Sequence, residues 1–90
     1  GRELAIVRRK CPGAPEALAR DIVAFTQRLR ALDLFHAPGI AETLDWARAL
    51  HELGTRELDT AAAAATLGVA VKYREDAERV RHALDQLLAG

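Results

Sequence analysis

Residues 39–53 read GIAETLDWARALHEL, and this stretch decides the fold because it holds the only tryptophan of the chain. At about 100° per residue, its apolar side chains fall on one half of a helical wheel and its charged side chains on the other. The stretch therefore predicts an amphipathic helix whose apolar half is covered by the rest of the chain. That half comprises Ile40, Leu44, Trp46, Ala47, Leu50 and Leu53.

Glycine marks both ends of this predicted helix. Gly39 is a tolerated N-cap, and Glu42 stands three residues later, where its carboxylate reaches back to the cap backbone. Gly54 follows the last periodic residue and suits a left-handed terminator. We expect the helix to begin just after Gly39 and to stop at Gly54.

Two helices are predicted before this stretch. Residues 2–11 place apolar side chains at i, i+3 and i+7 ahead of a Pro-Gly stop, namely Leu4, Val7 and Cys11. A second helix starts at Pro15 and carries a narrow apolar stripe of Leu18, Ile22, Phe25, Leu29 and Leu32. In the connector 33–38 we expect Leu34 and Phe35 to be tucked against the core and His36 to be a surface or cap residue.

Two further elements are predicted after it. Asp59 or Thr60 caps a short alanine helix over 61–65 that ends at Gly68. The last helix runs from about Val69 to Leu88. Its apolar face comprises Tyr73, Ala77, Val80, Leu84, Leu87 and Leu88. No strand pattern of comparable quality occurs, so residues 1–90 are predicted to form one all-α domain, a small bundle of four to five helices.

The composition narrows the class of protein. Thirteen basic and thirteen acidic residues cancel, which argues against a domain held to nucleic acid by bulk charge. Residues 1–30 nevertheless carry a net charge of +4 and residues 31–90 a net charge of −4. This asymmetry suits docking between unlike surfaces, and it equally suits two solvated faces of one bundle.

The single cysteine, Cys11, rules out an internal disulfide and favours a reduced, cytoplasmic setting. The longest apolar run, residues 61–67, is far too short to cross a bilayer, so no membrane is expected as a partner. The chain contains no methionine at all. We therefore expect it to be a piece of a longer protein.

No catalytic or metal-binding constellation stands out. The sequence has no phosphate-binding loop of the Walker type and no serine to act as a nucleophile. Its three histidines, His36, His51 and His82, lack ligand spacing, and its carboxylates fall on predicted solvated faces, including Glu75, Asp76 and Glu78. A helix-turn-helix reader of DNA is also disfavoured, because the central helix offers Arg48 alone among acidic residues.

Three stretches resemble one known family. They are RELAIVRRKCPG at 2–13, GIAETLDWARAL at 39–50 and LGVAVKYRED at 67–76. Together, and in this order, they look like the C-terminal helical lid of MoxR-type AAA+ ATPases. The resemblance spans nearly the whole chain.

The resemblance implies a role within a larger machine. Such proteins join a nucleotide-binding core, which holds ATP and Mg, to a small helical lid. They assemble into rings and use ATP hydrolysis to remodel or activate partner proteins, often metalloenzymes, with a von Willebrand factor A protein as companion. The implied partners of this chain are therefore the AAA+ core of the same protein, neighbouring ring subunits and such a companion, and catalysis belongs to the core.

The resemblance also directs attention to the start of the central helix. Many AAA+ lids place an arginine, called sensor 2, near this point to reach the nucleotide phosphates. Residues 39–43 contain no arginine. Backbone N–H groups at Gly39, Ile40 and Ala41 remain as the candidate nucleotide-facing groups, although Glu42 opposes an anion there. We expect this lid to contribute shape and coupling more than phosphate charge.

A second hypothesis stays open at this stage. A stand-alone helical adaptor that binds protein partners without nucleotide has the same composition and periodicity. The reading frame separates the two hypotheses, because a phosphate-binding loop encoded upstream of Gly1 supports the lid.

Overall fold

The structure is a computed structural model that describes residues 1–89. Within these residues the chain contains no strand and folds into six helices. They are α1 (Arg2–Lys10), α2 (Glu16–Ala31), α3 (Ile40–Glu52), α4 (Thr60–Ala70), α5 (Arg74–His82) and α6 (Leu84–Ala89). The predicted all-α class is confirmed, and the predicted count of four to five helices is too low.

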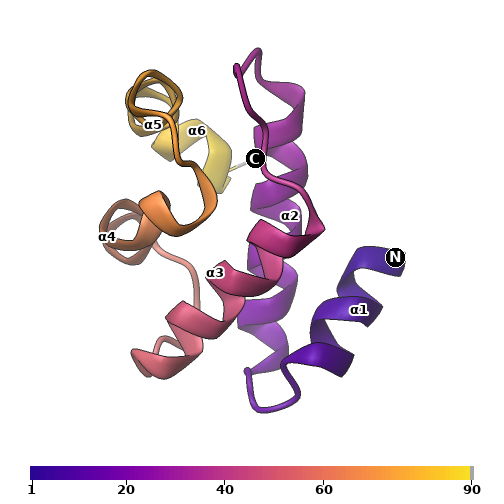
Figure 1. The fold of residues 1–90 in the computed structure, drawn as a ribbon. Coiled ribbons are helices and arrows are strands. Elements are labelled where there is room, and N and C mark those ends of the chain that lie inside the picture. The colour runs from indigo at the N-terminus through magenta and orange to yellow at the C-terminus, as the bar shows by residue number, and fades with distance from the viewer. Residues whose placement is uncertain (90) are drawn as a thin grey trace.

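The longest helix, α2, runs the height of the molecule (Figure 1). Helix α1 lies on one side of it, α3 crosses in front of it, and α4, α5 and α6 lie on the other side (Figure 1). Helix α3 packs against α1, α2 and α4, while α6 packs against α2 and α4. Every one of these helices is too short or too polar to cross a membrane.

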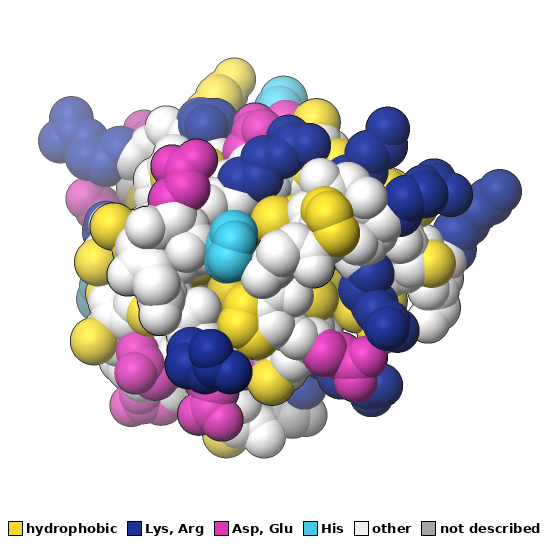
Figure 2. Space-filling model, turned by 90° about the horizontal axis from the view of Figure 1, so that it is seen from below, with side chains coloured by type: hydrophobic (Ala, Val, Ile, Leu, Met, Phe, Trp, Pro, Cys, Tyr) yellow, Lys and Arg dark blue, Asp and Glu magenta, His cyan; other side chains and the backbone are white. Residues whose placement is uncertain are grey.

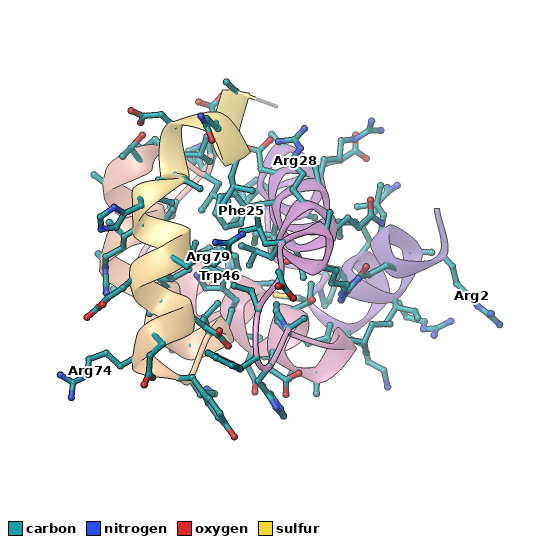
Figure 3. All side chains as sticks on the ribbon, turned by 90° about the horizontal axis from the view of Figure 1, so that it is seen from above. Arg2, Phe25, Arg28, Trp46, Arg74 and Arg79 are labelled. Carbon is teal, nitrogen blue, oxygen red and sulfur yellow. The ribbon has the colours of Figure 1, made fainter. Side chains whose placement is uncertain are left out.

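Trp46 of α3 occupies the centre of the core with no exposed surface. Its indole N–H donates to Thr66 Oγ1 of α4 at 2.7 Å, and the Thr66 hydroxyl in turn donates to the Ala62 carbonyl at 2.7 Å. The Phe25 ring of α2 meets the indole edge to face, with centroids 5.3 Å apart. Figure 3 shows Trp46 and Phe25 lying between the surrounding helices. The predicted role of Trp46 as a core residue is confirmed, and its one polar atom is satisfied.

The caps that the sequence predicts are present. The Gly39 N–H donates to Glu42 Oε1 at 2.7 Å, which closes the first turn of α3. Gly54 follows α3 with a φ of +76°, the left-handed geometry that glycine adopts without strain. Asp59 accepts from the Ala62 N–H at 2.8 Å and so caps α4. Cys11 ends α1 and is buried, as expected of a small apolar residue.

The second half of the chain differs from the prediction. Helix α4 does not stop at Gly68 but continues through it to Ala70, since Gly68 keeps helical backbone instead of the left-handed geometry of a terminator. The predicted single helix over 69–88 is wrong. Val71 is extended and almost fully buried, so the chain changes direction there, and a further break at Ala83 separates α5 from α6. Packing of the buried Val71 overrides the helical periodicity.

Four apolar side chains predicted to face the core are exposed instead. Ile40 is 42% exposed and Leu53 is 69% exposed because they stand at the first residue of α3 and just after its last, beyond the helices that cover its middle. Phe35 is 81% exposed in the connector, where its neighbour Leu34 supplies the buried contact. Tyr73 is 51% exposed because it precedes α5 rather than lying within a helix.

Candidate functional site

The proposed nucleotide-facing residues lie at the surface, where the connector between α2 and α3 enters α3. In the structure this connector comprises residues 32–39. Gly39 is half-buried with extended backbone, while Ile40 and Ala41 are exposed. The first N–H groups of a helix have no partner within the helix and are open to acceptors from outside. Whether nucleotide meets Gly39, Ile40 and Ala41 stays a prediction.

Two side chains already occupy the polar groups of Gly39. Its N–H is bonded to the Glu42 carboxylate, and a Cβ built on Gly39 would lie 3.2 Å from Glu42 Oε1. Its carbonyl accepts from the Thr43 N–H at 3.1 Å and lies 3.0 Å from Thr43 Oγ1. An incoming anion therefore meets a carboxylate at this helix start, which opposes the attraction of the helix dipole.

A guanidinium from α2 stands beside this helix start. Arg30 Nε donates to the Pro38 carbonyl at 2.8 Å, and its two terminal nitrogens each donate to one oxygen of Glu3 at 2.7 Å. Thr43 Oγ1 lies 3.3 Å from Arg30 and 3.1 Å from Glu3. This bidentate pair joins α1, α2 and α3, and it neutralises the arginine that contacts Pro38 and Thr43 beside Gly39.

The pair is partly sheltered from solvent, since the Glu3 side chain is 10% exposed and that of Arg30 is 32% exposed. Hydrogen bonds from Arg30 hold the pKa of Glu3 below its usual value of 4.5, and the same bonds raise the pKa of Arg30. Because the folded-state pKa of Glu3 is depressed, its stabilising contribution is complete above the unfolded pKa. It is lost as the pH falls through the folded pKa.

Replacing Glu3 by glutamine is expected to destabilise the fold near neutral pH and to matter less in acid. At about pH 7 we expect a loss of about 1–2 kcal/mol in the free energy of unfolding, because the charged bidentate pair is gone. As the pH falls from 4.5 through the lowered folded-state pKa of Glu3, the wild-type carboxylate becomes protonated and the two proteins converge in stability. Urea unfolding across this range measures the difference, and a difference that stays constant with pH would contradict the assignment.

A buried carboxylate holds the connector from the other side. Asp76, the third residue of α5, is 2% exposed. Its two oxygens accept from the Phe35 N–H and the His36 N–H, both at 2.9 Å. Its place in the first turn of α5 also favours its negative charge. The prediction that Asp76 lies on a solvated face is wrong, since its carboxylate binds backbone about 40 residues earlier in the chain.

Exposed aromatic and apolar side chains surround the hydrogen bonds between Asp76 and the connector. The His36 ring stacks on Tyr73 with centroids 5.4 Å apart and an interplanar angle of 12°. Phe35, Ile40 and Tyr73, hereafter the apolar rim, are exposed, and the backbone N–H groups of Phe35 and of Gly39, which precedes Ile40, are hydrogen-bonded to carboxylates. Exposed apolar side chains of this size are typical of surfaces that another protein surface covers.

The polar side chains around the connector and the start of α3 are engaged in hydrogen bonds within the fold. Within residues 1–89, no group of three or more His, Cys, Asp or Glu side chains is placed to hold a metal ion. In the same part of the chain, every buried side-chain nitrogen or oxygen has a hydrogen-bond partner. The polar groups of the site are therefore committed to holding the connector and the start of α3.

Sequence reasoning missed the residues that build this site. Glu3, Arg30 and Thr43 come together from three helices, and Asp76 reaches the connector across the fold. A signal exists for Asp76 alone, because an aspartate in the first turn of a helix is suited to accept backbone N–H groups. Nothing in the local pattern indicates that those groups belong to Phe35 and His36.

Comparison with known proteins finds no match to this chain among protein-family models, curated proteins or solved structures.

Proposed function

We propose that this chain is the C-terminal helical lid of a MoxR-type AAA+ ATPase. In that role it couples ATP binding and hydrolysis in a core domain to ring assembly, and to the remodelling or activation of partner proteins of the metalloenzyme-maturation type. The proposal rests on the three stretches of sequence that resemble such lids, and the all-α bundle agrees with it.

The structural observation that supports the proposal is the apolar rim. Phe35 leaves 81% of its surface uncovered although its backbone N–H is bonded to a buried carboxylate. An exposed aromatic on ordered backbone costs solvation in the isolated domain and is favourable when a second surface covers it. A core domain lying against the entry to α3 supplies such a cover, close to the residues where the resembled family meets nucleotide.

The charges around α3 favour a lid that couples to the core and leaves nucleotide binding to it. ATP and Mg would be bound by the core, because Glu42 and the Arg30–Glu3 pair leave no free cation at Gly39, Ile40 and Ala41 within the described residues. The lid would then transmit changes in the nucleotide through α3 and the connector, whose backbone is hydrogen-bonded to Asp76. Partner subunits and a von Willebrand factor A companion enter through the resemblance alone.

Substitutions in the parent protein test this role. Phe35→Asp or Ile40→Asp is expected to lower ATP turnover at least about tenfold, because a carboxylate in the covered rim must be desolvated. Ala65→Asp, which adds the same charge at an exposed position of α4, is expected to leave turnover within about twofold, as is Arg48→Ala. Equal effects of the rim and control variants would count against the proposal.

Nucleotide binding by the isolated chain gives a second test. We expect no measurable affinity for Mg–ATP by calorimetry. Appreciable binding would overturn the lid assignment. Absence of a phosphate-binding loop from the reading frame upstream would instead favour the stand-alone adaptor, whose apolar rim would dock a separate protein.

A further inference from the structure

The acidic residues at positions 1–30 are all engaged within the fold: Glu3 with Arg30, Glu16 with Arg8 and Arg20, and Asp21 with the Leu58 N–H. Glu3 is the only acidic residue of α1, and its side chain is turned toward α2 and 10% exposed. Three cations of the same helix have no acidic or carbonyl partner within residues 1–89: Arg2, Arg9 and Lys10. The positive charge of the first part of the chain is thus concentrated on α1.

Two of these cations share the outer face of α1 with an exposed alanine. Arg2, Ala5 and Arg9 are spaced by three and four residues, so they lie along one side of the helix, whereas Val7 lies on the buried side. Arg2 points away from the molecule (Figure 3). In Figure 2, Lys and Arg side chains gather on the right, the side on which Figure 1 places α1. The outer face of α1 therefore presents two arginines about 10.5 Å apart along the helix axis, with a small side chain between them.

A hollow of about 580 Å³ adjoins this face, between α1 and the turn that leads into α2. Its lining includes the small apolar side chains of Ala5, Pro12 and Ala14 together with Arg9. Glu16, the acidic residue that lines it, is paired with Arg8 and Arg20. The hollow therefore offers room for an aliphatic side chain of a partner, directly beside unpaired positive charge.

The arginines that follow α2 in the chain stand beside acidic residues instead. Arg48 lies 3.9 Å from Asp45, and Arg56 precedes the exposed Glu57. On α5, acidic and basic residues alternate: Arg74, Glu75, Glu78, Arg79 and Arg81. Neighbouring charges of opposite sign offset each other toward an approaching anion. Uncompensated positive charge within residues 1–89 is thus a property of the outer face of α1.

The surroundings of this face indicate which anion it suits. Proteins that bind nucleic acid by charge neutralise roughly six to ten phosphates, and those that bind single strands stack the bases on aromatic rings. Helix α1 offers three unpaired cations and contains no aromatic residue. A helix that binds a membrane surface inserts large apolar side chains, and those exposed here lie on other elements: Phe35, Ile40, Leu53 and Tyr73. Carboxylates of a polypeptide fit better, since one carboxylate pairs bidentately with one guanidinium.

We propose that the outer face of α1 binds an acidic helix of a partner protein. Carboxylates seven residues apart on such a helix are about 10.5 Å apart along its axis, which matches the spacing of Arg2 and Arg9. An aliphatic side chain midway between them lies over Ala5 and enters the adjoining hollow. The inference does not depend on the proposed lid function, because this face is separate from the apolar rim and from Gly39.

Fluorescence anisotropy with a designed peptide tests this interaction. The probe is a fluorescein-labelled peptide of about 21 residues, long enough to form a helix, with glutamates seven residues apart, a leucine midway on the same face, and alanine and glutamine elsewhere. At about 50 mM salt we expect saturable binding that weakens at least about fivefold when glutamine replaces the glutamates. Equal binding of the two peptides, or no binding, would overturn the proposal. Tighter binding of oligothymidylate or of phosphatidylserine vesicles than of the acidic peptide would overturn it in favour of those anions.

Removing the two arginines locates the contact. R2Q/R9Q is expected to weaken binding of the glutamate peptide at least about tenfold, because both guanidinium–carboxylate pairs are lost. R74Q/R79Q removes two exposed arginines from α5 and is the matched control, expected to bind within about twofold of the wild type. Circular dichroism checks that every variant is folded. Equal losses in the two variants would show that net charge alone attracts the peptide, and would refute a site on α1.

Ala5→Arg separates helix packing from attraction by charge. The change adds a cation to the basic face, yet it is expected to weaken binding at least about fivefold, because the new side chain fills the place of the leucine of the peptide. Ala65→Arg adds the same side chain at an exposed position of α4 and is expected to leave binding within about twofold. Tighter binding by the Ala5→Arg chain would overturn the proposed packing of a helix over Ala5.

Discussion

Replacing Trp46 by alanine is expected to destabilise the domain more than any other single change, by about 3–5 kcal/mol. The indole has no exposed surface, packs against Phe25 and donates to Thr66, so its removal leaves a cavity between α2, α3 and α4. A chain of this size has a total stability of about 5–13 kcal/mol. Urea unfolding followed by circular dichroism at 222 nm measures the loss.

The control for this change is Leu53→Ala, on the same stretch of chain. Leu53 is 69% exposed, so its truncation is expected to change the free energy of unfolding by less than about 0.5 kcal/mol. Thr66→Val isolates the hydrogen bond, because it keeps the shape but leaves the indole N–H without its acceptor, at an expected cost of about 1–3 kcal/mol. A Trp46→Ala cost similar to that of Leu53→Ala would show that the indole is not the centre of the core.

Replacing Asp76 by alanine is expected to be the second largest effect, about 3 kcal/mol. The change removes the acceptor of two backbone N–H groups, those of Phe35 and His36, and hydrogen bonds to a buried charge are stronger than those between neutral groups. The connector should loosen as a result. Urea unfolding gives the energetic cost, and amide hydrogen exchange at Phe35 and His36 reports the local release.

Glu75→Ala is the matched control for this change. Glu75 is the preceding residue in the same first turn of α5 but is exposed, so its removal is expected to cost less than about 1 kcal/mol. Asp76→Asn is expected to fall between the two, because the amide keeps one acceptor oxygen but places an N–H₂ group against a backbone N–H. Equal exchange rates at Phe35 in the Asp76→Ala and Glu75→Ala proteins would contradict a role of Asp76 in holding the connector backbone.

The first half of the fold follows from local chemistry. Amphipathic periodicity identifies α1, α2 and α3, and the residues that cap α3 and α4 are readable as such because capping depends on neighbours within a few positions. The division of residues 69–89 is not readable, because the apolar stripe of α5 continues into α6 across the break at Ala83. Periodicity alone cannot detect a change of direction that keeps the same face buried.

The candidate site follows from the sequence only in part. Its place at Gly39, Ile40 and Ala41 comes from a resemblance and stays a prediction. Two contacts shape this site. Arg30 pairs with Glu3, 27 residues away in the chain, and Asp76 binds connector backbone about 40 residues away. Such pairs depend on how the helices pack, which the pattern of one helix does not contain.

The burial of Trp46 has a spectroscopic consequence. The chain holds one tryptophan, so its indole emission comes from a single apolar environment formed by α2, α3 and α4. Rigid-body movement of the whole bundle against another domain leaves that environment unchanged, whereas loosening of the core shifts the emission to longer wavelength. Intrinsic fluorescence of this chain therefore distinguishes a domain that moves from a domain that melts.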